Sequence, residues 1–405
     1  MVNDIKGFIY TYLKKTSLNT SKHMQSLPAL LGFLFLIFAL QSCQTPERVL
    51  KSNDLDYKIK TATKWYNKKE YVKCIPVFEE LMGLMKGTKS TEDIYYMYCW
   101  ANYKQQDYLL ASYHFNNFTK LNPNSDKAEE CLYMSAKSHA KLSPKYQLDQ
   151  TNTYKAIESF QTFVNSYPES NRVDTANDEF TQLRKKLEKK MLKNADLYYK
   201  TEMYKAAATY YKNILVDYPD TDDPDYIYFM IVKAYDKYAK NSMPGKKAER
   251  YHDVSKAFDD FQYRFPKSKY LLEAKEIAEE SHFNAVNAAF QYAKGSKPDE
   301  RAKEYESVIA EINNQLPFVI GEKQQSKIQK DLQKAYYMAI KSNLLYTEEV
   351  SDAQKEKLLN QSIKTYYTFV DKFKDGPYNK KAESAFLQAS EKLKKLKENG
   401  QEQKN

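Results

Sequence analysis

The chain has 405 residues, of which 42% are hydrophobic, and a formal net charge of +10. This hydrophobic content is enough to bury a core and excludes a wholly disordered chain. The excess of lysine and arginine is spread along the sequence, without a compact basic block or a basic-aromatic motif, so we expect no nucleic-acid partner.

The N-terminal region has the layout of a secretory signal peptide. Lys14, Lys15 and Lys22 precede residues 29–40, which read ALLGFLFLIFAL and form an apolar run too short to span a bilayer comfortably. The run ends in LQSC at residues 40–43, which resembles the lipobox of bacterial lipoproteins, although Gln41 departs from the usual small or aliphatic residue. This resemblance implies cleavage before Cys43, acylation of Cys43 and, because Gln44 rather than aspartate follows, sorting to the outer membrane.

We therefore expect residues 1–42 to be a signal peptide and residues 43–54, which are polar, to be a lipid-anchored tether. Acyl chains on Cys43 would hold the protein on a membrane surface, at about 0.8 kcal/mol for each buried CH₂ group. An uncleaved anchor helix with an unmodified Cys43 is the alternative. Because the stretch before Met24 is unusually long, translation could also begin at Met24.

A helical segment that ends at a proline recurs along the chain. In its clearest copy, Ala156, Phe160 and Phe163 lie on one helical face and Pro168 ends the helix. The same offsets recur in three further copies: Ala111, Phe115, Phe118, Pro123; Ala207, Tyr211, Ile214, Pro219; and Val254, Phe258, Phe261, Pro266. Two residues after each proline stands a serine or threonine, which we expect to cap the following helix.

A second pattern precedes most of these segments: a small residue with a tyrosine four positions later. The pairs are Ala62 and Tyr66, Cys99 and Tyr103, Ala195 and Tyr199, and Ala234 and Tyr238. A small residue lets two helices approach closely, and the tyrosine fills the adjacent groove. The combined pattern resembles the tetratricopeptide repeat, with closing prolines 45, 51 and 47 residues apart instead of the usual period of about 34.

The expected fold is thus all-α: a tetratricopeptide-like α-solenoid of about five helical hairpins over residues 55–281. A helical C-terminal extension follows over residues 282–397, and residues 398–405 are expected to be a disordered tail. The extension is predicted to hold one or two degenerate extra repeats, with a separate small helical bundle as the alternative.

The remaining cysteines are Cys74, Cys99 and Cys131. Cys74 and Cys99 occupy positions where other repeats carry alanine, so they are interpreted as small core residues. Three cysteines make no complete disulfide set, although a bridge between Cys74 and Cys99 stays possible. No metal-ligand spacing exists among them.

One segment carries a closer resemblance. Residues 143–171, SPKYQLDQTNTYKAIESFQTFVNSYPESN, are similar to the matching region of the BamD family, lipoproteins of the outer-membrane β-barrel assembly machine. The resemblance implies a lipid-anchored protein on the periplasmic face of the outer membrane. It also implies two kinds of partner, the barrel-forming assembly subunit and unfolded outer-membrane proteins. It ends near residue 281 and says nothing of the extension.

No catalytic constellation is evident. The five histidines have no metal-ligand spacing, and the chain has no glycine-rich phosphate loop or nucleophile elbow. We expect no enzyme, no cofactor and no metal. The alternative function is a tetratricopeptide lipoprotein scaffold in cell-wall synthesis or envelope coordination.

The 36 tyrosines are more than a core needs, and some are expected to line the face formed by the first helix of each hairpin. Aromatic rings there would give contact area to an extended peptide at low entropy cost. In the second repeat, Tyr96, Trp100 and Lys104 are the predicted peptide-binding residues, opposite the packing pair Cys99 and Tyr103 or beside it.

Overall fold

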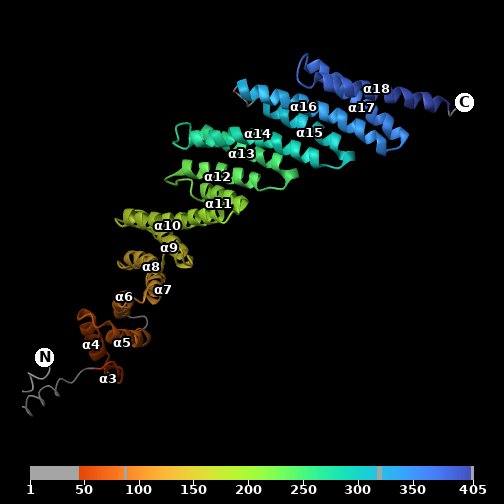
Figure 1. Cartoon of the computed structure of the whole chain (residues 1–405). Coiled ribbons are helices and arrows are strands. Elements are labelled where there is room, and N and C mark those ends of the chain that lie inside the picture. Colours follow the sequence, from red (N-terminus) through yellow and green to blue (C-terminus); the bar gives the residue numbers. More distant parts are fainter. Residues whose placement is uncertain (1–44, 86–88, 317–321, 403–405) are drawn as a thin grey trace, which may run out of the picture. The chain divides into compact units, whose positions relative to one another are not determined.

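The computed structural model describes residues 45–85, 89–316 and 322–402 (Figure 1). Throughout these ranges the regular elements are helices, without a strand. The predicted all-α class is therefore confirmed. The chain forms two compact units, divided between Leu183 and Arg184.

The first unit contains three complete helical hairpins after a short leading helix. Its helices are α3 (Pro46–Leu50), α4 (Leu55–Asn67), α5 (Tyr71–Leu84), α6 (Lys89–Lys104), α7 (Tyr108–Leu121), α8 (Ala128–Leu142), α9 (Thr151–Ser166) and the first part of α10 (Val173–Lys200). Each helix from α4 to α8 packs against the next along the chain. Hairpins of this unit thus stack in sequence order, as the repeat pattern predicts.

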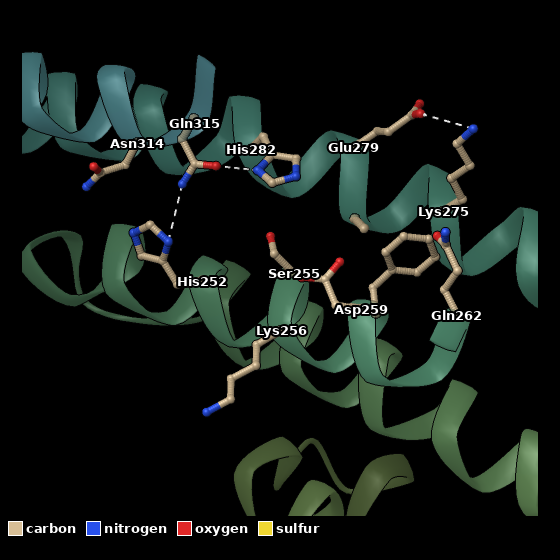
Figure 2. A pocket seen from close by; sticks show the side chains of 12 residues that line it. His252, Ser255, Lys256, Asp259, Gln262, Lys275, Glu279, His282, Asn314 and Gln315 are labelled. Atoms are coloured by element: carbon tan, nitrogen blue, oxygen red, sulfur yellow. Dashed lines mark hydrogen bonds and ion pairs between the residues drawn. The ribbon is translucent and has the colours of Figure 1, made fainter. Parts of the chain in front are cut away.

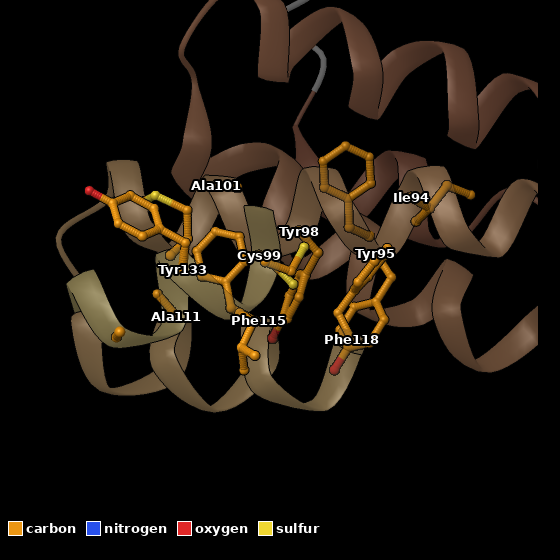
Figure 3. Packing of buried hydrophobic residues seen from close by; sticks show 14 of the residues in the cluster. Ile94, Tyr95, Tyr98, Cys99, Ala101, Ala111, Phe115, Phe118 and Tyr133 are labelled. Carbon is orange, nitrogen blue, oxygen red and sulfur yellow. The ribbon is translucent and has the colours of Figure 1, made fainter. Parts of the chain in front are cut away.

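The core of the first unit is built from the residues that the repeat pattern selects. Ala111, Phe115 and Phe118 of α7 are fully buried, and they pack with Tyr95 and Cys99 of α6 (Figure 3). The small residues leave room for the rings, so the helices can approach closely. The predicted face of α9 is buried in the same way.

The second unit continues the alternation of helices. It holds the remainder of α10 and the helices α11 (Tyr204–Asp217), α12 (Pro224–Lys240), α13 (Pro244–Arg264), α14 (Leu271–Gly295), α15 (Pro298–Gln315), α16 (Glu322–Tyr346), α17 (Asp352–Lys372) and α18 (Asn379–Glu402), with a 3₁₀ turn, η2, at Thr347–Glu349. Consecutive helices from α11 to α18 pack against one another. The extension therefore follows α14 by the same packing of each helix on the next. Whether it forms extra repeats or a small bundle stays a prediction.

The closing prolines end the second helices in the expected manner. The helices α7, α9, α11 and α13 each stop two residues before their proline. The residue between helix and proline leaves the helical region, as at Tyr167, where φ is −134° and ψ is 65°. A proline disfavours the helical conformation for the residue before it, which explains the stop.

The prediction that the serine or threonine after each proline caps the following helix is wrong, because the N-cap residues are Lys127 for α8, Asp223 for α12 and Tyr270 for α14. Ser170 accepts a hydrogen bond from the backbone N–H of Arg172 at 3.1 Å, but it stands before the helix start and does not cap α10. Its hydroxyl donates to Glu129 on α8, the preceding first helix, at 2.6 Å. The same contact to an acid joins Ser125 to Glu92, Thr221 to Glu188 and Ser268 to Asp225. We call these contacts the acid–hydroxyl clamps.

At the two ends, the helices differ from the predicted segment boundaries. The tether includes α3, whose Val49 is fully buried against the first repeat. The last helix runs to Glu402, past the predicted end at residue 397, and the boundary between residues 281 and 282 falls within α14. Cys43 and the predicted signal peptide lie outside the described residues. Among the helices of the described ranges, none is long and apolar enough to cross a membrane.

Candidate peptide-binding surface on the first helices

The first helices of several hairpins carry an aromatic side chain with a lysine four positions later, whose ammonium group lies over the ring. Four residues make one helical turn, so the two side chains share a face of the helix. The pairs are Trp100 and Lys104 on α6, Tyr133 and Lys137 on α8, Phe229 and Lys233 on α12, and Tyr337 and Lys341 on α16, with nitrogen-to-centroid distances of 5.1, 5.6, 4.9 and 5.9 Å. We call them the aromatic–lysine pairs.

The structure places all three predicted peptide-binding residues on one stripe of α6. Tyr96 is half-buried, and its hydroxyl donates to the carboxylate of Glu130 on α8. The ring of Tyr96 packs edge-on against Phe118, with centroids 6.2 Å apart, and Lys127 lies over it at 5.2 Å. Tyr96 therefore links two successive first helices through its hydroxyl while its ring helps to close the core.

Trp100 lies beside the packing pair of α6 and not opposite it. Its ring contacts Tyr103 and Phe115 edge-on, both at 5.6 Å between centroids. Lys104 is exposed and covers the same indole. Trp100 thus contributes to packing on one edge, and the lysine that covers its face carries positive charge to the surface.

Sequence reasoning missed the corresponding residues on the next first helix. Tyr133 of α8 is buried, and cations from two elements cover it: Lys137, and Arg172 at 6.0 Å. Lys137 also pairs with Glu179 of α10 at 3.3 Å. The signal that would have found Lys137 is its spacing of four residues from an aromatic residue on a first helix, the spacing already seen in Trp100 and Lys104.

A similar arrangement occurs in the second unit. Lys233 lies over Phe229 and pairs with Glu273 of α14 at 3.0 Å. Phe229 also stacks on Tyr270, with ring centroids 4.8 Å apart and an interplanar angle of 8°. Both units therefore present aromatic rings covered by lysine, with an acid of the following first helix beside the lysine.

The electrostatic setting of this surface follows from partial burial. Burial raises the pKa of Tyr96, and the hydrogen bond to Glu130 raises this pKa further, so the phenol stays protonated and donates. Burial alone would lower the pKa of Lys137. The charges of Tyr133 and Glu179 and their hydrogen bonds to Lys137 raise it by more, so the pKa of Lys137 is raised. The surface therefore offers fixed positive charges and aromatic edges, which suit the binding of a polar, aromatic-rich chain.

The described part of the chain offers no group of three or more histidine, cysteine, aspartate or glutamate side chains that could hold a metal ion. His139 of α8 is hydrogen-bonded through Nδ1 to Ser159 at 2.8 Å, and burial lowers its pKa. This contact joins the two helices of one hairpin, so His139 contributes to the packing of α8 on α9.

Cys74, Cys99 and Cys131 are all buried and free, so the disulfide that the sequence left open between Cys74 and Cys99 is wrong. Burial raises the pKa of the Cys74 thiol to about 12. Cys74 and Cys99 fill the positions that alanine takes in other repeats, as predicted, because a thiol behaves as a small apolar group in a core.

The stacked hairpins and their first-helix surface define the class of the protein: a tetratricopeptide-like helical-repeat protein. Residues 56–224 match the family YfiO, described as outer membrane lipoprotein. Two relatives carry the name outer membrane protein assembly factor BamD. The one from Pasteurella multocida is 25% identical over 44% of this chain and 73% of its own length, and the one from Vibrio cholerae is 27% identical over 30% of this chain and 55% of its own length. Part of the chain, residues 56–224, is thus similar to this family of outer-membrane lipoproteins, and the chain is similar to two proteins named BamD.

Among solved structures, the chain is similar to the TPR2AB domain of yeast Sti1 in complex with an HSP90 peptide, with 12% identity, a TM-score of 0.29, and coverage of 69% of this chain and 98% of that one. A tetratricopeptide repeat protein from Parabacteroides merdae has 9% identity and a TM-score of 0.23, and covers 83% of this chain and 98% of that one.

Proposed function

We propose that this protein is a non-enzymatic scaffold in the assembly of outer-membrane β-barrel proteins. The observation that carries the proposal is the family match over residues 56–224, which coincides with the hairpins from α4 to α11. The two named relatives are assembly factors of outer-membrane proteins. A stack of hairpins offers a long surface for other proteins and needs no catalytic group to use it.

The proposed partners are the barrel-forming assembly subunit and segments of unfolded outer-membrane proteins. For the unfolded segments we propose the first-helix surface of the first unit, at Tyr96, Trp100 and Lys104. The edges of the rings supply contact area without loss of side-chain freedom, because packing already holds them. Lysine heads that lie over rings add attraction to carboxylates of the bound segment.

Titration with the C-terminal peptide of a barrel protein tests this surface. We expect weak, sequence-tolerant binding that the double variant Trp100→Ala, Lys104→Ala reduces several-fold. The matched control is Tyr154→Ala, which removes an exposed ring of α9, a second helix, and should leave binding unchanged. Absence of binding at millimolar peptide would count against the receptor role.

The proposed location is the periplasmic face of the outer membrane, with the anchor on Cys43. Cells that express the protein should incorporate radiolabelled palmitate into it, and Cys43→Ala should abolish the labelling. The buried Cys74 is a useful control, because Cys74→Ala should leave the label in place. Labelling that survives Cys43→Ala would end the lipoprotein proposal.

The decisive experiment is a pull-down of the full chain from solubilised outer membrane. The assembly proposal expects the barrel-forming subunit in the eluate. Recovery of peptidoglycan synthases without that subunit would instead support a scaffold of cell-wall synthesis. A parallel pull-down without residues 297–405 asks whether the extension contributes, and this truncation keeps α14 whole.

A further inference from the structure

A polar cluster outside the first-helix surface joins three helices of the second unit (Figure 2). His252 comes from α13, His282 from α14, and Glu311 and Gln315 from the end of α15. Gln315 is the centre of the cluster and is buried, with 3% of its surface exposed. A cleft of about 550 Å³ borders the cluster and opens it to water.

Each polar atom of the Gln315 amide has a partner in this cluster. Its nitrogen donates to Glu311 Oε1 at 2.8 Å and to His252 Nδ1 at 3.3 Å. Its oxygen accepts from His282 Nδ1. His252 Nε2 lies 3.0 Å from Glu311 Oε2 and donates to it. This pattern requires a neutral His252 with its proton on Nε2, because Nδ1 accepts.

Protonation of His252 changes which atom of the Gln315 amide can form a hydrogen bond with it. The added proton turns Nδ1 from an acceptor into a donor, which then faces the donating amide nitrogen. The amide restores the contact by rotating, so that its oxygen faces His252 and its nitrogen faces His282. This rotation gives up the bond from the amide nitrogen to Glu311 Oε1, which must turn away from the amide oxygen, while Glu311 Oε2 keeps its bond to His252. His282 must then present a bare Nδ1 and carry its proton on Nε2.

We propose that His252, Gln315, His282 and Glu311 form a proton-sensitive latch, which controls how firmly α15 packs on the α13–α14 hairpin. Gln315 links the charge of His252 to the tautomer of His282. Glu311 holds the protonated state as an ion pair across the α13–α15 contact. The latch joins the end of α15 to the α13–α14 hairpin, so it regulates how the helices after α14 are attached and is independent of the peptide surface.

The charges around His252 set the direction of the latch. The groups on the three latch helices are Glu249, Asp253, Lys256 and Asp259 on α13, Lys275, Glu279 and His282 on α14, and Glu311 on α15. On α12, which also packs against α13, Asp236 and Lys240 pair with each other at 3.0 Å, and Asp236 acts on Tyr251. The hydrogen bond to Glu311 raises the pKa of His252, against the effect of burial, and the charges of Glu311, Asp253 and Glu249 add to it.

The sign of the effect follows from this raised pKa. The folded state binds the proton more tightly than the unfolded state, so the latch stabilises the α15 contact fully below the ordinary pKa of 6.5. The stabilisation is lost as the pH rises through the folded pKa. Acid therefore tightens the attachment of α15.

Hydrogen exchange of the full chain at pH 6 and pH 8, corrected for the intrinsic rate, tests the latch. We expect the amides of α15 to be several-fold better protected at the lower pH. His252→Gln keeps a donor to Glu311 but cannot titrate, so this difference should vanish. His114→Gln is the matched control in the first unit and should leave α15 unchanged. An equal pH response of α15 in the wild type and His252→Gln would overturn the proposal.

Imidazole nitrogen NMR provides a second measurement that does not depend on the stability of a variant. In the wild-type protein, the tautomer of His282 should change at the pH at which His252 gains its proton. Gln315→Met removes the amide at similar volume, and the two events should then separate. If the imidazole nitrogen signals of His282 in the wild type do not change over the pH range in which His252 titrates, the proposal is also overturned.

Discussion

Ala156 and Phe160 illustrate how one helical face of this protein is built. Both side chains are fully buried, one turn apart, on α9. Because the side chain of Ala156 is short, the neighbouring helix can approach closely. Phe160 packs edge-on against Tyr133 of α8, with ring centroids 6.2 Å apart. The same pairing of a buried small residue with a buried aromatic residue one turn later recurs at Ala111 and Phe115.

At the scale of one residue, Phe160→Ala should lower the free energy of unfolding of the first unit by about 3–5 kcal/mol, because it removes a fully buried ring and leaves a cavity. Tyr154→Ala on the same helix removes a ring that is 60% exposed and should change the free energy by about 0.5 kcal/mol or less. Urea denaturation measures both. Similar losses in the two variants would contradict the packing described for α9.

A second prediction at this scale concerns His114, which contacts Tyr95 through Nδ1 at 3.2 Å. Burial lowers the pKa of His114 below its usual 6.5. The unfolded chain therefore takes up this proton first, and stability falls as the pH decreases from 6.5 toward the folded pKa. The free energy of unfolding, measured between pH 7 and pH 5, should fall less steeply in His114→Gln than in the wild type. Some pH dependence remains in this variant, because burial also lowers the pKa of His139. An equal dependence of the free energy of unfolding on pH in the variant and the wild type would show that folding does not lower the pKa of His114.

The acid–hydroxyl clamps work at the scale of the element. Each clamp joins the start of one first helix to an acid of the preceding first helix. At Glu129, the hydroxyl of Ser170 at 2.6 Å and the guanidinium of Arg172 at 2.9 Å reach the same oxygen. Because the helices are rigid, one such contact near their ends fixes the register between successive hairpins.

Ser170→Ala should therefore loosen the start of α10 more than it unfolds the protein. Ser170 is only partly buried, so we expect a loss of about 1 kcal/mol, the usual net size for one hydrogen bond in a protein. Faster hydrogen exchange in the first turn of α10 should accompany it. Ser170→Thr keeps the hydroxyl, and Ser166→Ala removes an exposed one from the end of α9, so both should behave like the wild type. Equal exchange in Ser170→Ala and Ser166→Ala would argue against the clamp.

For the whole molecule, the important feature is that the extension belongs to the second compact unit. Val286 and Ala293 of α14 share a hydrophobic core with α15, α16, α17 and α18. The family match, by contrast, ends at residue 224, close to the start of α12. The boundary of the resemblance is therefore not a boundary of the fold.

Two truncations distinguish these boundaries. Removal of residues 282–405 cuts α14 in the middle and uncovers half of α13, whereas removal of residues 297–405 leaves the α13–α14 hairpin complete. The shorter protein should unfold at a temperature several degrees lower than the longer one, because an incomplete hairpin exposes its apolar face. Calorimetry provides the comparison. Equal midpoints would mean that the second half of α14 contributes little.

The amino-acid sequence alone specified the helices, their ends and most of their buried faces. Phe163 and Pro168 make this clear: helical spacing marks a buried face, and the restriction that proline places on the residue before it ends the helix locally. Such signals lie within a few residues of one another, so they can be read without knowing what packs where. The sequence also indicated that Tyr96, Trp100 and Lys104 share one helix, while the packing of Trp100 against Tyr103 and Phe115 was not predicted. Their role in peptide binding stays a prediction.

Only the tertiary structure decided which distant residues meet. Ser170 and Glu129 are 41 residues apart in sequence, and His252 and Gln315 are 63 apart. No local sequence pattern predicts either pair, because each contact depends on the angle and register between stacked hairpins. The same reason explains why the shared core of α14, α15, α16, α17 and α18 became visible only in the structure, since no repeat signature describes this part of the chain clearly.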